Sequence, residues 1–406
     1  MNSRLTDTRG HSYSAQSILE FLARPRTLFG LAFVLRLLAI PLAVFRISPY
    51  SQADATGFSV VAGILAQRIL SGTLSTATRY TDTYEIWSSV LSPFWFLPVG
   101  GPVLARIFIA MLGACAVYNA VLIARRLGTP MAGLLTGVPL AVYPSIVLVQ
   151  SSLLREAAVL FSVTTTARLL LIVSDHGQVP FASSRSRETV ALVVLSGGLL
   201  AFATLLREYN LPLYVAAIGA GCIAYYSKTW WGKAVAALAV VAGGVGAWVL
   251  RELLLGRFNF FRDARARGRT VYLSGVRFDT LLDLISFAPI GAAYFLFTPF
   301  PWQIGSVLDV PVMFEGLTNI LYAFAGVAGV VVAFKRDRVA TIGLLTYFVL
   351  GVTFYGLGTA NFGTGVRHRQ MFSWVLLVFG GVGAHWLWVR YVPLQWKQTV
   401  RRLTVV

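Results

Sequence analysis

Long apolar runs, separated by short polar and basic turns, follow one another along the whole chain. Ten of them are long enough to cross a bilayer as helices, at residues 28–46, 103–124, 130–150, 156–173, 189–206, 211–227, 233–250, 311–334, 339–358 and 370–389. Because the runs are continuous and do not alternate, they exclude a transmembrane barrel. We therefore predict an all-α polytopic membrane protein with about ten transmembrane helices, in a single integral membrane domain over residues 1–406.

Two apolar stretches are rich in aromatic residues and proline and do not fit as spans. Residues 86–98 lie in the first predicted outer loop, 47–102, and residues 280–300 lie in a long interrupted segment, 251–310. We expect both stretches to form interfacial or re-entrant helices on the outer face. The C-terminal helices then occupy residues 311–406.

Composition agrees with a membrane protein. The chain is 57% hydrophobic and 12% charged, with a mean hydropathy of +0.72, whereas soluble domains carry about 25% charged residues. The net charge of +18 comes from 34 Lys and Arg against 16 Asp and Glu. In a membrane protein this excess indicates basic turns and contact with anionic lipid, and it does not imply a nucleic-acid partner.

Basic residues set the predicted orientation. With the N-terminus in the cytoplasm, every cytoplasmic turn is basic, as shown by Arg125-Arg126, Arg185 and Arg187, Lys228 and Lys233, Lys335-Arg336-Arg338, and the tail with Arg390, Lys397, Arg401 and Arg402. The sequence therefore predicts a multi-pass plasma-membrane protein with both termini in the cytoplasm. Arginines in the outer segments 251–280 and 359–369 oppose this rule, so we expect them to meet a functional demand.

Asp54 follows the first apolar run in a chain that has few carboxylates. After it comes a short helical pattern with one apolar face, made of Phe58, Val61, Ala62, Leu65 and Ala66. Asp54 is either the cap of this surface helix or a general base placed just outside the bilayer.

Three further charged residues lie at predicted outer ends of helices. Arg155 and Glu156 stand at the start of helix 156–173, and Arg207 stands at the end of helix 189–206. Charges at membrane depth are costly and usually functional, so Glu156 is a candidate catalytic acid. The alternatives are an ion pair that only positions helices, and an Arg207 that snorkels to the surface. Within the spans, the deep charges we expect are Arg36 and Arg168.

The outer turn 359–369 has the character of a phosphate site. Asn361 and Gly363-Thr364-Gly365 precede Arg367-His368-Arg369. Glycines let backbone N–H groups approach an anion, two arginines offer forked donors, and the next helix begins here. The alternative is an interfacial anchor for lipid headgroups.

The sequence contains no recognisable motif for a cofactor or a metal ion. The four histidines are scattered, no Cys/His spacing fits zinc, and no nucleotide-phosphate loop is present. We therefore predict no cofactor and no metal ligands, and leave a divalent ion open. An activated substrate is expected to arrive through the membrane.

Taken together, these residues resemble the GT-C superfamily of lipid-linked glycosyltransferases, in the branch of protein O-mannosyltransferases and the lipid A aminoarabinose transferase. The resemblance covers a core of about residues 28–175 and a later pair of segments. It is carried by Asp54-Ala55-Thr56-Gly57-Phe58, Leu104-Ala105-Arg106-Ile107 with Ala124-Arg125-Arg126-Leu127-Gly128, Tyr143-Pro144-Ser145 through Arg155-Glu156, and Pro299-Phe300-Pro301-Trp302 with Asn361 to Arg369. Family members often have an acidic pair where Asp54 precedes Ala55, and usually an Asp where Glu156 stands.

The resemblance implies a polyprenyl-phosphate or pyrophosphate sugar donor and an acceptor hydroxyl from a glycan, lipid or protein, at the outer face. Asp54 would be the general base, and Glu156 would orient the acceptor or hold an arginine. Arg367, Arg369, His368, Arg155 and Arg207 would bind the donor phosphate. Trp302, Asn361, Arg265 and Arg267 would line the substrate groove. The transfer would invert the anomeric centre.

Two other classes stay open. A surface-polysaccharide polymerase or an O-antigen-ligase-like enzyme would rely on outer-face arginines without needing Asp54. A lipid or glycan transporter, or flippase, would show broken helices that meet near the bilayer midplane.

Overall fold

The computed structural model describes residues 21–45, 52–73, 82–97, 100–175, 186–227 and 229–392. The basic residues Arg185, Lys228, Lys397, Arg401 and Arg402 lie outside the described residues. The helices, in chain order, are α2 Pro25–Val44, α3 Gln52–Leu70, α4 Asp82–Leu91, η1 Ser92–Phe96, α5 Gly101–Leu127, α6 Pro130–Val142, α7 Pro144–Gln150, α8 Glu156–Asp175, α9 Ser186–Leu206, η2 Glu208–Asn210, α10 Leu211–Tyr226, α11 Trp230–Val249, α12 Arg251–Arg265, α13 Leu281–Phe297, η3 Pro301–Gln303, α14 Asp309–Arg336, α15 Arg338–Leu357 and α16 Phe362–Tyr391.

Long apolar helices dominate the described part of the chain. Eight of them are long and apolar enough to cross a membrane, or nine if the bent pair α6 and α7 counts as one span. Within the same residues, β structure is limited to an isolated bridge between Val271 and Asn361. The expectation of an all-α, multi-pass membrane protein is confirmed at this level.

Three predicted helices differ in detail from the observed ones. The run 130–150 forms two helices bent by 60° at Tyr143. The run 211–227 forms α10, with 16 residues, which at about 1.5 Å per residue is shorter than a bilayer core of about 30 Å. The last helix begins at Phe362 and not at residue 370, because the side chain of Asn361 accepts a hydrogen bond from the Thr364 N–H and caps it.

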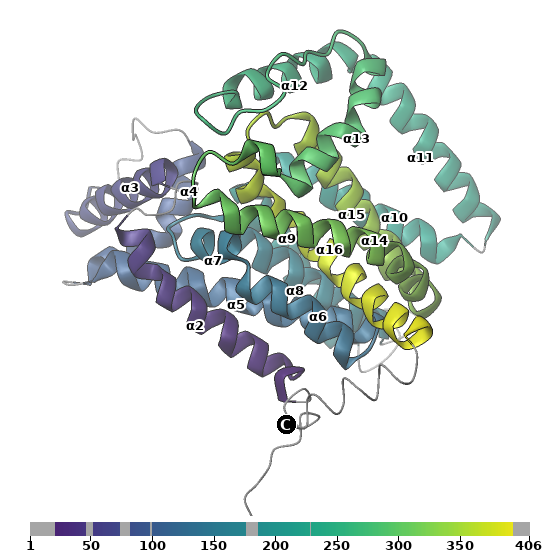
Figure 1. The fold of residues 1–406 in the computed structure, drawn as a ribbon, viewed down its shortest axis with the longest axis horizontal. Coiled ribbons are helices and arrows are strands. Elements are labelled where there is room, and N and C mark those ends of the chain that lie inside the picture. Colours follow the sequence, from purple (N-terminus) through teal and green to yellow (C-terminus); the bar gives the residue numbers. More distant parts are fainter. Residues whose placement is uncertain are drawn as a thin grey trace, which may run out of the picture.

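The amphipathic pattern after Asp54 forms α3. Phe58, Val61, Ala62 and Ala66 are buried, and Leu65 is partly buried. The aromatic stretch that begins at residue 86 continues α4 and then η1, and α3 packs against both. In Figure 1, α3 and α4 lie together at one side of the bundle.

Helix α16 runs through the centre of the bundle. It packs against α14, α6, α15 and α5, and Figure 1 shows it alongside α14. Glycines on both helices allow this close approach, because a β carbon on Gly329 would overlap the carbonyl oxygen of Phe379 and one on Gly383 would overlap that of Ala325.

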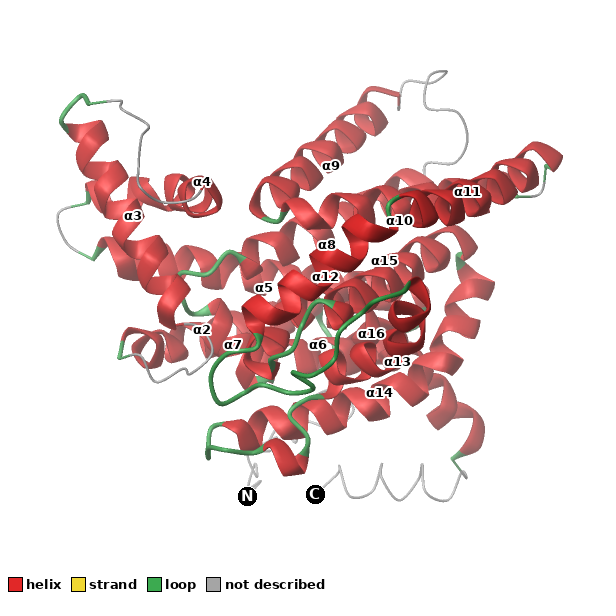
Figure 2. Ribbon diagram, turned by 90° about the horizontal axis from the view of Figure 1, so that it is seen from above, coloured by secondary structure: helices red, strands yellow, loops and turns green. Residues whose placement is uncertain are grey.

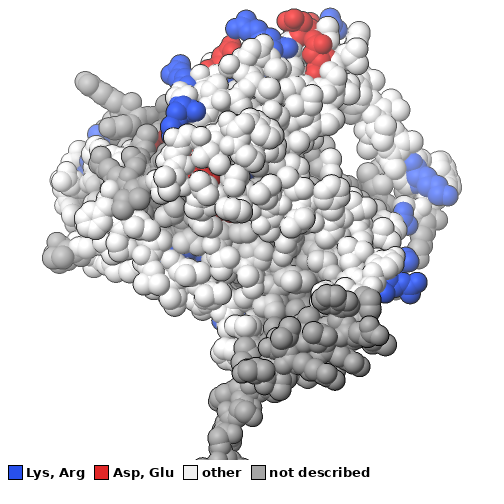
Figure 3. Space-filling view, viewed as in Figure 1, with Lys and Arg blue, Asp and Glu red and all other residues white. Residues whose placement is uncertain are grey.

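The two ends of the bundle carry different groups. At one end, the guanidinium of Arg126 pairs with Asp175 and Asp337, and Arg336 donates to the carbonyl of Gly128. At the other end, called here the Asp54 end, α8, α14 and α16 begin and α9 and α15 finish. Helix α12 lies across this end, which Figure 2 shows from above. Figure 3 shows a broad surface almost without charged side chains between the charged edges, as a membrane-embedded belt requires.

We predict that Gly329→Ala destabilises the fold by about 1–3 kcal/mol, because the added methyl forces α14 away from α16. Thermal unfolding in detergent measures this loss. Gly326→Ala is the matched control, since its β carbon would have the Gly380 nitrogen as its nearest neighbour, at 3.7 Å. Equal stability of the two variants would contradict the close approach of these helices.

Candidate functional site

Arg367, in the second turn of α16, bridges two carboxylates at the Asp54 end. Its Nη1 lies 2.7 Å from Oδ2 of Asp54, and its Nη2 lies 3.1 Å from Oε1 of Glu156. The side chain of Glu156 is fully buried, whereas that of Asp54 is 37% exposed. One guanidinium therefore joins the deepest acid of the site to its most accessible one.

The local sequence places Asp54 for this contact. Asp54 is the third residue of α3, and Gly57, one turn later, faces the ring of Tyr84, which a β carbon on Gly57 would approach to 2.7 Å. This space lets the Tyr84 hydroxyl donate to Oδ1 of Asp54 over 3.0 Å. Two side chains, those of Tyr84 and Arg367, therefore hold the Asp54 carboxylate.

Helix α4 fixes this arrangement to the bundle. The indole of Trp87 donates to the carbonyl of Leu153, just before α8, and Ser88 donates to the carbonyl of Phe58 on α3. Both side chains are buried. These bonds set the position of Asp54 relative to Glu156.

Glu156 is the first residue of α8 and holds two arginines with one oxygen. Its Oε1 lies 2.7 Å from Nη2 of Arg207 as well as 3.1 Å from Arg367. Arg155 lies beside them, with its guanidinium carbon 5.9 Å from the centre of the Phe58 ring. The structure thus brings Asp54, Glu156, Arg367, Arg207 and Arg155 into one cluster.

Electrostatics in the cluster keep the Asp54 carboxylate ionised and the Tyr84 phenol protonated. Burial raises the pKa of Asp54, but the charge and hydrogen bond of Arg367 and the hydrogen bond of Tyr84 outweigh it and hold the pKa below its ordinary value. Burial and then the charge of Asp54 raise the pKa of Tyr84, so the phenol stays a donor. Asp54 is therefore an ionised acceptor at neutral pH.

The cluster contains three arginines and two acids. Arg207 and Arg367 pair with Glu156, and the charge of Arg155 also acts on Glu156. Burial and then repulsion by Arg207 lower the pKa of Arg155 to about 10. Among the described residues, the Nε atoms of Arg207 and Arg367 and Oε2 of Glu156 are buried without a hydrogen-bond partner. The arginines of the cluster suit a bound anion.

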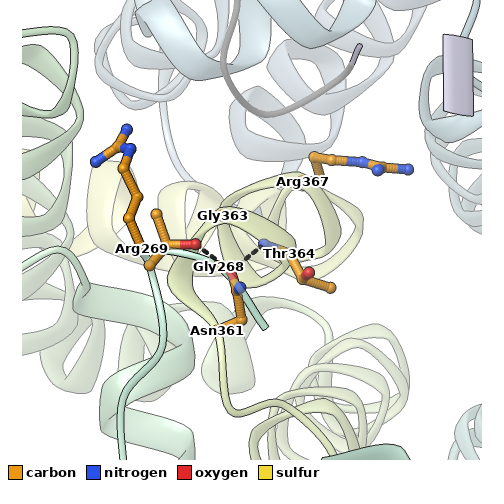
Figure 4. Close-up of a pocket in the computed structure, with 7 residues that line it drawn as sticks. Gly268, Arg269, Asn361, Gly363, Thr364 and Arg367 are labelled. Carbon is orange, nitrogen blue, oxygen red and sulfur yellow. Dashed lines mark hydrogen bonds between the residues drawn. The ribbon is translucent and has the colours of Figure 1, made fainter. Parts of the chain in front are cut away.

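A polar pocket of about 300 Å³ opens beside Arg367. It is lined by backbone and side chains of two segments, Gly268-Arg269-Thr270 and Asn361 with Gly363, Thr364 and Arg367. Figure 4 shows Arg269 and Arg367 extending in different directions from these two segments. The pocket therefore borders the cluster and has room for a small polar group.

The wall of this pocket is held by main-chain bonds. The Tyr272 N–H donates to the carbonyl of Ala360, and the Phe362 N–H donates to that of Thr270. Asn361 adds its amide, which donates to the carbonyl of Arg267, and its side-chain oxygen accepts from Thr270 and from the Thr364 N–H. Asn361 thus shapes the pocket through two backbone groups and the Thr270 hydroxyl.

Arg369 and His368 do not join Arg367. Arg369 is buried on another face of α16 and lies 2.8 Å from Oε2 of Glu315, while donating to the carbonyl of Thr298. The ring of His368 is buried edge-on against Tyr355, at 5.3 Å. The predicted fork of Arg367 and Arg369 is absent because the three residues stand in a helix, where neighbours point about 100° apart.

The predicted groove residues are dispersed. Trp302 is 73% exposed and stacks on Phe300, whose ring centre is 4.9 Å away. Arg267 is exposed and contributes its carbonyl. Arg265 donates to the carbonyl of Gly358, and burial lowers its pKa. Of these, Asn361 lines the pocket.

The sequence did not predict three polar contacts, which involve Tyr84, Glu315 and Arg269. Tyr84 stands just before the aromatic stretch 86–98. A phenol in the same outer loop as Asp54 was the sequence signal that could have predicted their hydrogen bond. Glu315 lies inside the predicted span 311–334, and a carboxylate at that depth was a signal too. Arg269 makes a forked pair with Asp309, at 2.5 and 3.0 Å, which no sequence spacing indicated.

Comparisons with known proteins do not extend this picture. Neither models of known families, nor curated proteins, nor solved structures match the chain. Within the described residues, no group of three or more His, Cys, Asp and Glu side chains is arranged to hold a metal.

We predict that Arg369 is structural. Arg369→Met alone leaves the Glu315 charge buried and unpaired, and lowers the free energy of unfolding by about 3–5 kcal/mol. The double variant Arg369→Met with Glu315→Leu recovers most of this loss, because both charges are removed. Denaturation in detergent measures both, and a double variant as unstable as the single one would contradict the role.

We also predict the pH dependence of the Asp54 contact. Since the pKa of Asp54 is lower in the folded than in the unfolded chain, the contact stabilises the fold above the unfolded carboxyl value of about 3.9. This stability is lost as the pH falls through the folded pKa. The difference in melting temperature between wild type and Asp54→Asn should hold from pH 8 to 5 and shrink below about pH 4. A difference that already shrinks between pH 7 and 5 would show a raised pKa instead.

Proposed function

We propose that the protein is a membrane glycosyltransferase of the GT-C type, which moves a sugar from a polyprenyl-phosphate or pyrophosphate carrier to an acceptor hydroxyl. The observation that carries the proposal is the ionised and partly exposed carboxylate of Asp54, held in one cluster with an excess of arginine. This reaction needs a base beside an anion site, and Asp54, the proposed base, contacts Arg367, which belongs to the proposed anion site.

The membrane arrangement completes the proposal. In this proposal the chain crosses the cell membrane ten times, with α10 as a short span, so that both termini are cytoplasmic and the Asp54 end is at the outer face. The carrier's apolar chain stays in the bilayer, and its phosphate reaches Arg367, Arg207 and Arg155 at the boundary. Glycan, lipid and protein hydroxyls are all suitable acceptors.

The chemistry follows from the charges. The acceptor oxygen attacks the anomeric carbon of the sugar and forms the new C–O bond, while its proton passes to the Asp54 carboxylate. The bond from the anomeric carbon to the phosphate oxygen breaks, and its electron pair leaves with the carrier phosphate. Arginines stabilise that charge, so no general acid is needed. Displacement of this kind inverts the anomeric centre.

A polymerase or ligase-like enzyme is the second candidate, and one observation favours it. Arg367 lowers the pKa of Asp54, which weakens Asp54 as a base, while the arginines alone would serve a lipid-linked glycan. A transporter is the third, favoured by the 60° bend between α6 and α7.

We predict that Asp54→Asn lowers sugar transfer by about 10²–10⁴-fold, the usual worth of a general base. Wild type and variants are reconstituted with an extract of polyprenyl-phosphate sugars, and transfer to an acceptor is scored. Arg277→Ala is the control, because its side chain is 70% exposed and pairs with Asp263 away from the cluster. If the Asp54→Asn variant is active and the Arg367→Ala variant is inactive, the polymerase or ligase hypothesis is favoured over the glycosyltransferase.

A further inference from the structure

Arg367 has two carboxylate partners that differ in accessibility. Glu156 is fully buried and also holds Arg207, whereas Asp54 is 37% exposed and stands on the separate layer of α3 and α4. The contact with Glu156 is enclosed by the bundle. The contact with Asp54 is the one that a ligand entering from the open side would meet.

The same contact blocks the proposed base. While Oδ2 of Asp54 faces Nη1 of Arg367 at 2.7 Å, it cannot accept a proton from an acceptor hydroxyl without losing a strong ion pair. The other oxygen, Oδ1, is occupied by Tyr84. In this state Asp54 is ionised but engaged at both oxygens.

The geometry points to Arg367 as a charge switch: a phosphate monoester or diester bound at the cluster takes Nη1 of Arg367 from Asp54 and thereby releases the base. This inference rests on the proposed donor site, and makes donor binding the step that frees the carboxylate. Acceptor chemistry is then confined to the donor-bound state.

Three features suit such an exchange. Glu156 keeps Nη2 of Arg367, so the guanidinium turns without leaving the site. Tyr84 keeps Oδ1 of Asp54, so the carboxylate stays oriented after Arg367 has left Oδ2. The polar pocket beside Arg367 offers about 300 Å³ into which the phosphate can fit.

Charge drives the exchange in this direction. The cluster holds three arginines and two acids, and an entering phosphate meets the guanidinium groups of Arg367 and Arg207. A phosphate brings more negative charge and more acceptor oxygens than the single oxygen of Asp54 that it replaces. Asp54 and the phosphate then compete for Arg367. By linkage, the Asp54 contact weakens phosphate binding, and bound phosphate weakens the Asp54 contact.

The test uses the full chain in lipid nanodiscs and farnesyl phosphate, which carries no sugar, as the probe. Infrared difference spectra with and without the probe report the Asp54 carboxylate, whose band is assigned by its loss in Asp54→Asn. We expect the band to shift when the probe binds. An unchanged band at saturating probe, or no binding of the probe, overturns the switch.

Affinity gives an independent measure. Asp54→Asn should bind farnesyl phosphate about 10-fold more tightly than wild type, within the usual range of coupling between sites. Asp263→Asn is the matched control, since it removes an exposed acid of α12 that pairs with Arg277 outside the cluster, and its affinity should equal that of wild type. Equal affinities of Asp54→Asn and wild type for farnesyl phosphate would overturn the competition between Asp54 and the phosphate.

The outcome is separate from the proposed function. Because the probe has no sugar to transfer, a band shift together with tighter binding by Asp54→Asn supports the switch whether or not transfer is ever observed. Transfer without a band shift supports the glycosyltransferase and overturns the switch.

Discussion

The guanidinium of Arg367, in a low-dielectric environment, determines how the helices are arranged at the Asp54 end of the bundle. Arg367 sits on the central helix α16 and is stabilised by Glu156 from α8 and Asp54 from α3. A buried cation without such partners would be very costly, and so would the fully buried Glu156 without its arginines. The charges of α8, α9 and α16 are therefore interdependent, and the position of each helix end depends on the other two.

The accessory layer of α3 and α4 owes its position to this constraint. Its apolar contacts would allow several placements on a smooth helical surface, whereas Trp87, Ser88 and Tyr84 each make a directional bond. Directional polar bonds select one arrangement among apolar ones of similar energy. The carboxylate of Asp54 is in this way an element of both the architecture and the chemistry.

Much of this could be predicted from the sequence because membrane spans are encoded locally. The apolar runs of α2, α5, α8 and α14 needed only length and continuity, and the scarcity of acids directed attention to Asp54 and Glu156. What failed depended on helix phase and distant partners. Arg367, His368 and Arg369 were expected in a turn, and once Asn361 begins the helix at Phe362 they point to different faces. The Glu315 partner of Arg369 lies 54 residues away in the chain, and no local pattern reports such a pair.

The wall formed by residues 268–272 has a consequence for how this site can diversify. Part of its hold on the start of α16 is made of peptide groups, Tyr272 to Ala360 and Phe362 to Thr270, and peptide groups are common to nearly all residues. These two bonds do not depend on which side chains the four residues carry, whereas the bonds of Thr270 and Asn361 do. Arg269 is held differently, by its forked pair with Asp309 on α14, so a change at position 269 alters the polarity of the pocket and this link to α14 together.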